Sequence, residues 1–118
     1  MAVFNVGGQS VVVSTRSQNY WFFRRQGIKI EVSPNRHWWC LWLCSSTTSI
    51  DAIQCYIHLT GVAPDADATN KCSSCGSLDV MGPSFWGLSV PQPFQSVAFE
   101  GTVQISGKRY PISGTLVY

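Results

Sequence analysis

A regular alternation of apolar and polar residues runs from Ile53 to Thr60 and predicts a β-strand. Every second side chain in this segment is apolar and would face the interior: Ile53, Cys55, Ile57 and Leu59. A helix is the competing interpretation, because Ser49 would cap it and Gly61 would end it. We favour the strand because the alternation has no exception.

Shorter alternating runs predict further strands before and after this segment. They comprise Val11–Thr15, Asn19–Arg25, Gly27–Val32, a segment containing Val97, Phe99, Val103 and Ile105, and a returning strand over Arg109–Ser113. Gln26-Gly27 is the predicted turn between the second and third runs, and Ser106-Gly107 is the predicted turn of the last hairpin. Val62–Ser77 is predicted to be a loop and Gly82–Pro93 to be irregular, because both are rich in residues that interrupt regular structure.

The segment from His37 to Cys44 is the most apolar part of the middle of the chain. It contains three tryptophans, two leucines and two cysteines, and it follows a break at Pro34-Asn35. Both faces of a strand with this sequence would be apolar. We therefore expect a central strand that is covered on both sides.

Length and composition indicate a single β-rich domain over residues 1–118. The net charge of +2 is too small to indicate a nucleic-acid or membrane-surface partner by itself, and no apolar run is long enough for a transmembrane helix. The N-terminus lacks the pattern of a secretory signal. The five cysteines are an odd number, which favours a reducing compartment with free thiols or a metal site.

Two histidines and two loop cysteines are the candidates for nucleophilic catalysis. A cysteine attacks as its thiolate, and a nearby imidazole that is oriented by a third group lowers its pKa. His37 would be the base, His58 would orient it, and Cys72 or Cys75 would supply the thiol. In the plainer alternative, His37 only ends a strand and the loop cysteines have no chemical role.

The same two cysteines also allow a metal interpretation. Cys72 and Cys75 form a Cys-x-x-Cys motif of the zinc-knuckle type, which needs further ligands to complete a tetrahedral site. Cys40 and Cys44 would lie about 13 Å apart along a strand, at about 3.3 Å per residue, which is too far for both to bind one ion.

The segment Tyr20–Arg25 and Lys29 combine aromatic and basic residues, as proteins that bind single-stranded nucleic acid do. A weak RNA contact would use Arg24, Arg25 and Lys29. The alternative is that the aromatic residues belong to the core and the basic residues are only solvated.

Residues 27 to 60 resemble the H-box region of the lecithin:retinol acyltransferase family. The resemblance is carried by Ile28–Val32, by Pro34-Asn35-Arg36-His37-Trp38, and by Cys55-Tyr56-Ile57-His58-Leu59. It implies a small papain-like, NlpC-type α+β fold that is dominated by an antiparallel sheet and has little helix. It also implies that His37 is the base and that His58 is the second histidine, close to it on a neighbouring strand.

The nucleophile of that family lies in an Asn-Cys motif, whereas here Lys71 separates Asn70 from Cys72. This departure favours a degenerate, non-enzymatic scaffold like the H-box/NC type 2A proteins of picornaviruses. The resemblance then implies a non-structural viral accessory protein that acts in replication or assembly through host or viral proteins, in the host cytoplasm or at replication sites. The alternatives are an active Cys-His acyltransferase or hydrolase and a zinc-stabilised β interaction module.

Overall fold

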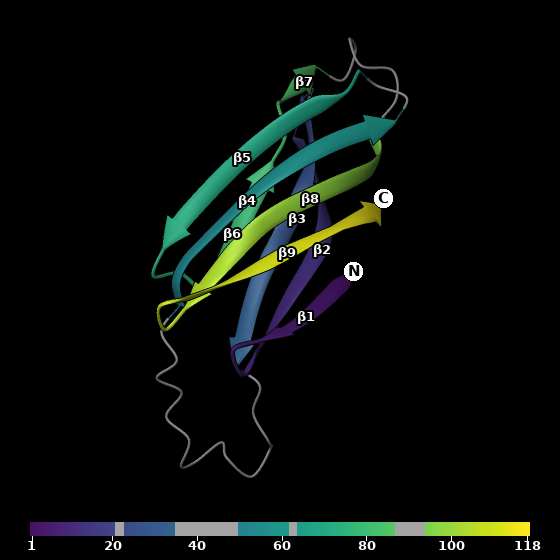
Figure 1. Ribbon diagram of the computed structural model, residues 1–118. Helices are drawn as coiled ribbons and strands as arrows, with labels where there is room; N and C mark the ends of the chain where they lie inside the picture. Colours follow the sequence, from purple (N-terminus) through teal and green to yellow (C-terminus); the bar gives the residue numbers. More distant parts are fainter. Residues whose placement is uncertain (21–22, 35–49, 62–63, 87–93) are drawn as a thin grey trace.

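The computed structural model describes residues 1–20, 23–34, 50–61, 64–86 and 94–118, and they form two antiparallel sheets packed face to face (Figure 1). Sheet A has the order β1-β2-β3-β6, and a short β7 also pairs with β3. Its strands are β1 (Ala2–Val6), β2 (Gln9–Tyr20), β3 (Phe23–Pro34), β6 (Ser77–Met81) and β7 (Phe85–Trp86). Sheet B has the order β5-β4-β8-β9, with β4 (Ile50–Gly61), β5 (Ala66–Ser73), β8 (Phe94–Ile105) and β9 (Lys108–Val117).

The predicted strand-dominated, antiparallel architecture is confirmed. The expected α+β fold also contained some helix around a single sheet, and here the described residues differ from it. They form two sheets and no helix, because their apolar residues recur every second position rather than every third or fourth. No described helix has the length and apolar character needed to cross a membrane.

The core lies between the two sheets and is built from both. On β4, Ile53, Cys55, Ile57 and Leu59 are all buried, as the alternation predicted. They pack in one cluster with residues of sheet A such as Val13 and Ile30, and with Phe99 of β8. The ring of Phe99 contacts that of Phe4 edge to face, with centroids 6.1 Å apart.

The hairpin β2–β3 differs from its prediction. Gln26 and Gly27 lie inside β3, and the chain reverses between Tyr20 and Phe23 instead. Gly27 is required here by a close approach rather than by a turn, because a Cβ atom on it would lie 2.1 Å from the carbonyl oxygen of Val80 in β6. The predicted turn at Gln26-Gly27 and the predicted strand Asn19–Arg25 are therefore wrong.

The predicted loop Val62–Ser77 contains a regular strand, β5, which pairs with β4 from Ala52 to Leu59. This strand escapes pattern recognition because it lies at a sheet edge and its partly buried apolar side chains are small ones such as Ala66 and Ala68. The turn at Ser106-Gly107 is confirmed. Both residues have positive φ, 50° and 83°, as a two-residue hairpin loop of type I′ requires.

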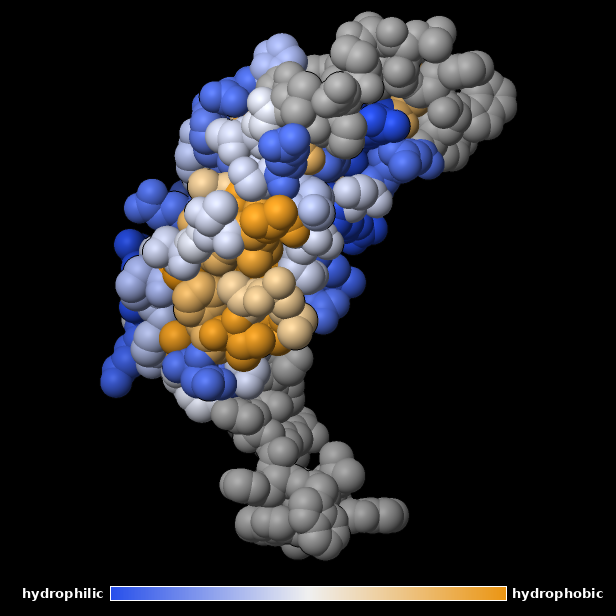
Figure 2. Space-filling view, turned by 90° about the vertical axis from the view of Figure 1, so that its right-hand side faces the viewer, coloured by the Kyte–Doolittle hydropathy of each residue, from blue (hydrophilic) through white to orange (hydrophobic). Residues whose placement is uncertain are grey.

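One side of the sandwich is bordered by the edge strands β1 and β9, and Figure 2 shows a band of apolar side chains there between polar surfaces. Phe4, Val6 and Tyr110 are partly buried in this region, whereas Val117 is 77% exposed. Pro111 lies within β9 and has no N–H to offer to an added strand, which makes this edge a poorer template for pairing.

The predicted strand over His37–Cys44 lies outside the described residues.

Candidate functional site

His58 lies on the outer face of sheet B between two carboxylates. Its partner across the β4–β5 pairing is Asp67, whose Oδ1 contacts the Nδ1 atom of His58. On the other side of the ring, Nε2 is 3.6 Å from Oδ2 of Asp65. The hydrogen bond to Asp67 is the main reason why the pKa of His58 is raised above 6.5, and the charges of both carboxylates add to the effect.

Asp67 also interacts with Tyr56, two residues before His58 on the same face of β4. Its hydrogen bonds to His58 and to Tyr56 lower the pKa of Asp67, and the same contact raises the pKa of Tyr56. The carboxylate therefore favours both the protonated imidazole and the neutral phenol. The sequence pattern already placed Tyr56 and His58 outward, but only the register of β5 brings Asp67 opposite them.

Tyr56 is 41% exposed and lies between two shallow depressions of the outer face. One depression, of about 430 Å³, is lined by residues that include Gln54, Glu100 and Arg109. The other, of about 270 Å³, lies between His58 and β9 and is also lined by Ser113 and Thr115. We call this surface the Tyr56 face and define it by Gln54, Tyr56, His58, Glu100, Arg109 and Ser113.

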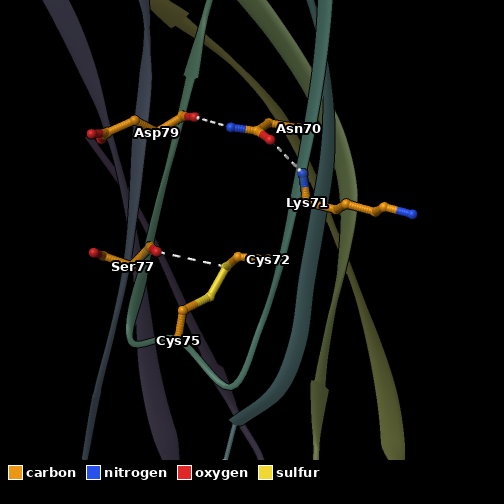
Figure 3. The surroundings of a disulfide bond; sticks show 6 residues. All are labelled: Asn70, Lys71, Cys72, Cys75, Ser77 and Asp79. Carbon is orange, nitrogen blue, oxygen red and sulfur yellow. Dashed lines mark hydrogen bonds between the residues drawn. A yellow bond between two sulfur atoms is a disulfide. The ribbon is translucent and has the colours of Figure 1, made fainter.

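Cys72 and Cys75 are joined in a disulfide at the turn between β5 and β6 (Figure 3). This turn carries the chain from sheet B to sheet A, and Asn70 supports it by donating a hydrogen bond from Nδ2 to the carbonyl oxygen of Asp79, at 2.9 Å. In this form neither sulfur is a thiolate that could attack a substrate or bind zinc.

The structure does not bring His58 and these cysteines together. Cys72 pairs with Ile53, whose side chain is buried between the sheets, whereas His58 lies on the opposite face of β4. The two positions are five residues apart along the strand, or about 17 Å at about 3.3 Å per residue. His37 lies outside the described residues.

Other groups in the described part of the chain do not replace the missing nucleophile or metal site. The thiol of Cys55 is buried, and burial raises its pKa to about 11, so it stays protonated and unreactive. The described ranges contain no group of three or more His, Cys, Asp or Glu side chains arranged to hold a metal ion. Cys40 and Cys44 are not among the described residues.

The basic residues considered for RNA do not share one surface. Arg24 lines the space between the sheets, whereas Arg25 and Lys29 alternate with it on the outer face of sheet A. Lys29 pairs with Glu31 at 2.8 Å, and Nε of Arg25 donates to the carbonyl oxygen of Gly82 at 3.2 Å. These residues therefore form no continuous cationic strip.

The comparisons with known proteins add no relative whose function could be transferred. No protein-family model matches the sequence, and it has no significant match among curated proteins or solved structures.

Proposed function

We propose that this protein is a non-catalytic β-sandwich module that binds a partner protein through the Tyr56 face. The observation that carries the proposal is the position of Tyr56, which is exposed on the outer face of sheet B and has a depression on each side. Tyrosine is one of the residues most enriched at the energetic centres of protein interfaces.

The surroundings of Tyr56 suit such a role. Asp67, which also contacts His58, lies close enough to Tyr56 to raise the pKa of its phenol. Glu100 and Arg109 supply charges of both signs around the ring, as is typical of the polar rim of an interface.

In the described part of the chain, no thiol is assembled with a base as the Cys-His alternative requires. A Cys-His acyltransferase or hydrolase would need a thiolate within hydrogen-bond reach of its base. Cys72 and Cys75 are bonded to each other, and Cys55 is buried with a raised pKa. The described residues thus contain no thiol placed to act with His58.

The H-box/NC resemblance extends this proposal to a non-structural viral accessory protein with host or viral protein partners in the host cytoplasm. Its support is the sequence of residues 27–60. The papain-like scaffold and the His37–His58 pair belong to the same extension. The two-sheet arrangement of the described residues supports the binding role more directly than it supports that scaffold.

Site-specific photocrosslinking tests the proposal. In one variant a benzophenone amino acid replaces Tyr56. In a matched control it replaces Ser14, which lies on the outer face of sheet A, and both variants are produced in cells. We expect the probe at position 56 to form an adduct that excess wild-type protein suppresses and that Tyr56→Ala protein does not. Identical adducts from both positions, or no adduct from position 56, would contradict the proposal.

An electrophilic ester probe distinguishes the enzymatic alternative. We expect no selective labelling of Cys72 or Cys75 in the unreduced protein. Labelling of one of them that is lost in His37→Ala would instead support a Cys-His acyltransferase or hydrolase.

A further inference from the structure

A cavity of about 850 Å³ lies between the two sheets, at the end where the β2–β3 hairpin extends past the core. Ser17, Asn19, Arg24 and Gln26 line it from sheet A, and Phe94 and Tyr118 are among the residues that line it from the other side. The register places Asn19 directly opposite Arg24 and Ser17 directly opposite Gln26. Two successive residue pairs thus present four polar side chains to the space between the sheets.

This polarity is unusual for the inner face of a sandwich, which normally carries apolar residues. Farther along the same hairpin the face is apolar, as in the buried pair Val13 and Ile30. Arg24 is half-buried, and it has no hydrogen-bond or ion-pair partner among the residues that the structure describes. A cation in such a place lacks full hydration and gains from a negatively charged ligand.

The walls of the cavity are held by hydrogen bonds between the sheets. The side chain of Gln26 donates from Nε2 to the carbonyl oxygen of Phe94 at 3.0 Å and accepts from the N–H of Phe94 at 2.7 Å. The hydroxyl of Tyr118 donates to the carbonyl oxygen of Gly27 at 2.7 Å. These contacts fix the cavity before any ligand binds, which lowers the entropic cost of binding.

We propose that this cavity binds a small organic monocarboxylate with an apolar body. The planar guanidinium of Arg24 matches a carboxylate, and the neighbouring amide of Asn19 and hydroxyl of Ser17 supply further donors. Arg24 is the only cation that lines the described cavity, so the charge matches one negative charge better than the two of a phosphate. Val117 and Tyr118 provide apolar surface for the body of the ligand.

This inference does not rest on the proposed function, because the cavity opens between the sheets and the Tyr56 face is the outer surface of sheet B. Its test is an NMR titration of the whole chain with benzoate, with the neutral analogue benzamide and with inorganic phosphate. We expect benzoate to shift the side-chain amide signals of Asn19 and Gln26. Benzamide and phosphate should shift them much less at equal concentration.

Two adjacent arginines provide matched variants. Arg24→Gln should weaken benzoate binding at least about tenfold through the loss of charge-assisted hydrogen bonds, whereas Arg25→Gln should leave it unchanged. Equal losses in both variants, equal binding of benzamide, or no shift with benzoate would overturn the proposal. Tighter binding of phosphate than of benzoate would overturn the assignment of a single negative charge. If Arg24→Gln fails to fold, the comparison of benzoate with benzamide on the wild-type protein still decides.

Discussion

Gln26 is the residue whose environment departs most from what its type suggests. It is 5% exposed, and both polar atoms of its amide bond to the backbone of Phe94 in the other sheet. Its side chain thereby satisfies the N–H and C=O at the first residue of β8, where strand pairing begins. A buried polar residue that is fully hydrogen-bonded specifies how the two sheets meet.

Gln26→Leu should therefore destabilise the protein although it adds apolar surface. The backbone of Phe94 would lose its two hydrogen bonds to the buried amide, each worth about 0.5–1.5 kcal/mol. We expect the free energy of unfolding, measured by urea denaturation, to fall by about 1–3 kcal/mol. Gln54→Leu is the control, because Gln54 is exposed on β4, and it should change stability by less than about 0.5 kcal/mol. Equal losses in the two variants would contradict the role of Gln26.

His58 should make a small contribution to stability that depends on pH. Its pKa is higher in the folded protein than the ordinary value of 6.5, so the stabilisation is fully present below about pH 6.5 and is lost as the pH rises through the raised pKa. The pKa of Asp67 is lowered below its ordinary value of 3.8. The stability that Asp67 contributes is therefore fully present above about pH 3.8 and is lost as the pH falls through the lowered pKa.

The check compares wild-type protein with His58→Gln by thermal unfolding at about pH 6 and about pH 9, on either side of the ordinary histidine range. At the lower pH the wild-type protein should unfold at a higher temperature than His58→Gln. The difference between the two unfolding temperatures should be smaller at the higher pH. A difference that grows with pH would contradict the pairing of His58 with Asp67.

At the scale of elements, the connection between β5 and β6 joins the two sheets at one corner. It is short, and the Cys72–Cys75 disulfide and the bond from Asn70 to Asp79 both constrain it. The double variant Cys72→Ser/Cys75→Ser should lower the free energy of unfolding by roughly 2 kcal/mol, the entropy expected for so small a loop. Reduction of the wild-type protein should give a similar loss in the same denaturation assay. An unchanged midpoint in both experiments would show that the disulfide does not stabilise this corner.

The close contact between β3 and β6 gives a second prediction at this scale. Any side chain on Gly27 would collide with the backbone of Val80 and Met81, which cannot move without breaking strand pairing. Gly27→Ala should therefore cost about 3 kcal/mol, as overpacking does, whereas Gly76→Ala, which faces open space, should be within about 0.5 kcal/mol of wild type. Chemical denaturation of the two variants makes the comparison, and similar stabilities would refute the close approach.

At the scale of the whole molecule, the two sheets share one buried cluster, so neither sheet keeps its core without the other. We expect far-UV circular dichroism and intrinsic fluorescence to report the same unfolding midpoint. Ile57→Ala, at a fully buried site in sheet B, should shift both signals together and cost about 2–5 kcal/mol. Two separate transitions would mean that the sheets unfold independently.

Much of the fold was predictable because alternation reports which face of a strand is buried. The strand through Ile57 and the Ser106-Gly107 hairpin follow from local pattern and turn chemistry. Gln26-Gly27 has residue types that favour a turn, whereas its structural role depends on Phe94 and β6, which are distant in sequence. β5 is not predictable from the pattern because a polar edge strand buries little and carries almost no apolar signal.

The sequence by itself determined which side chains of β4 face inward, and hence a fold built from strands, because side chains alternate between the two faces of a strand. Only the tertiary structure decided that Asp67 faces His58, that Cys72 bonds to Cys75, and that Arg24 lines a cavity between the sheets. These contacts depend on the register between strands and on the packing of two sheets. Both are set by the summed burial of many distant residues, which no local pattern records.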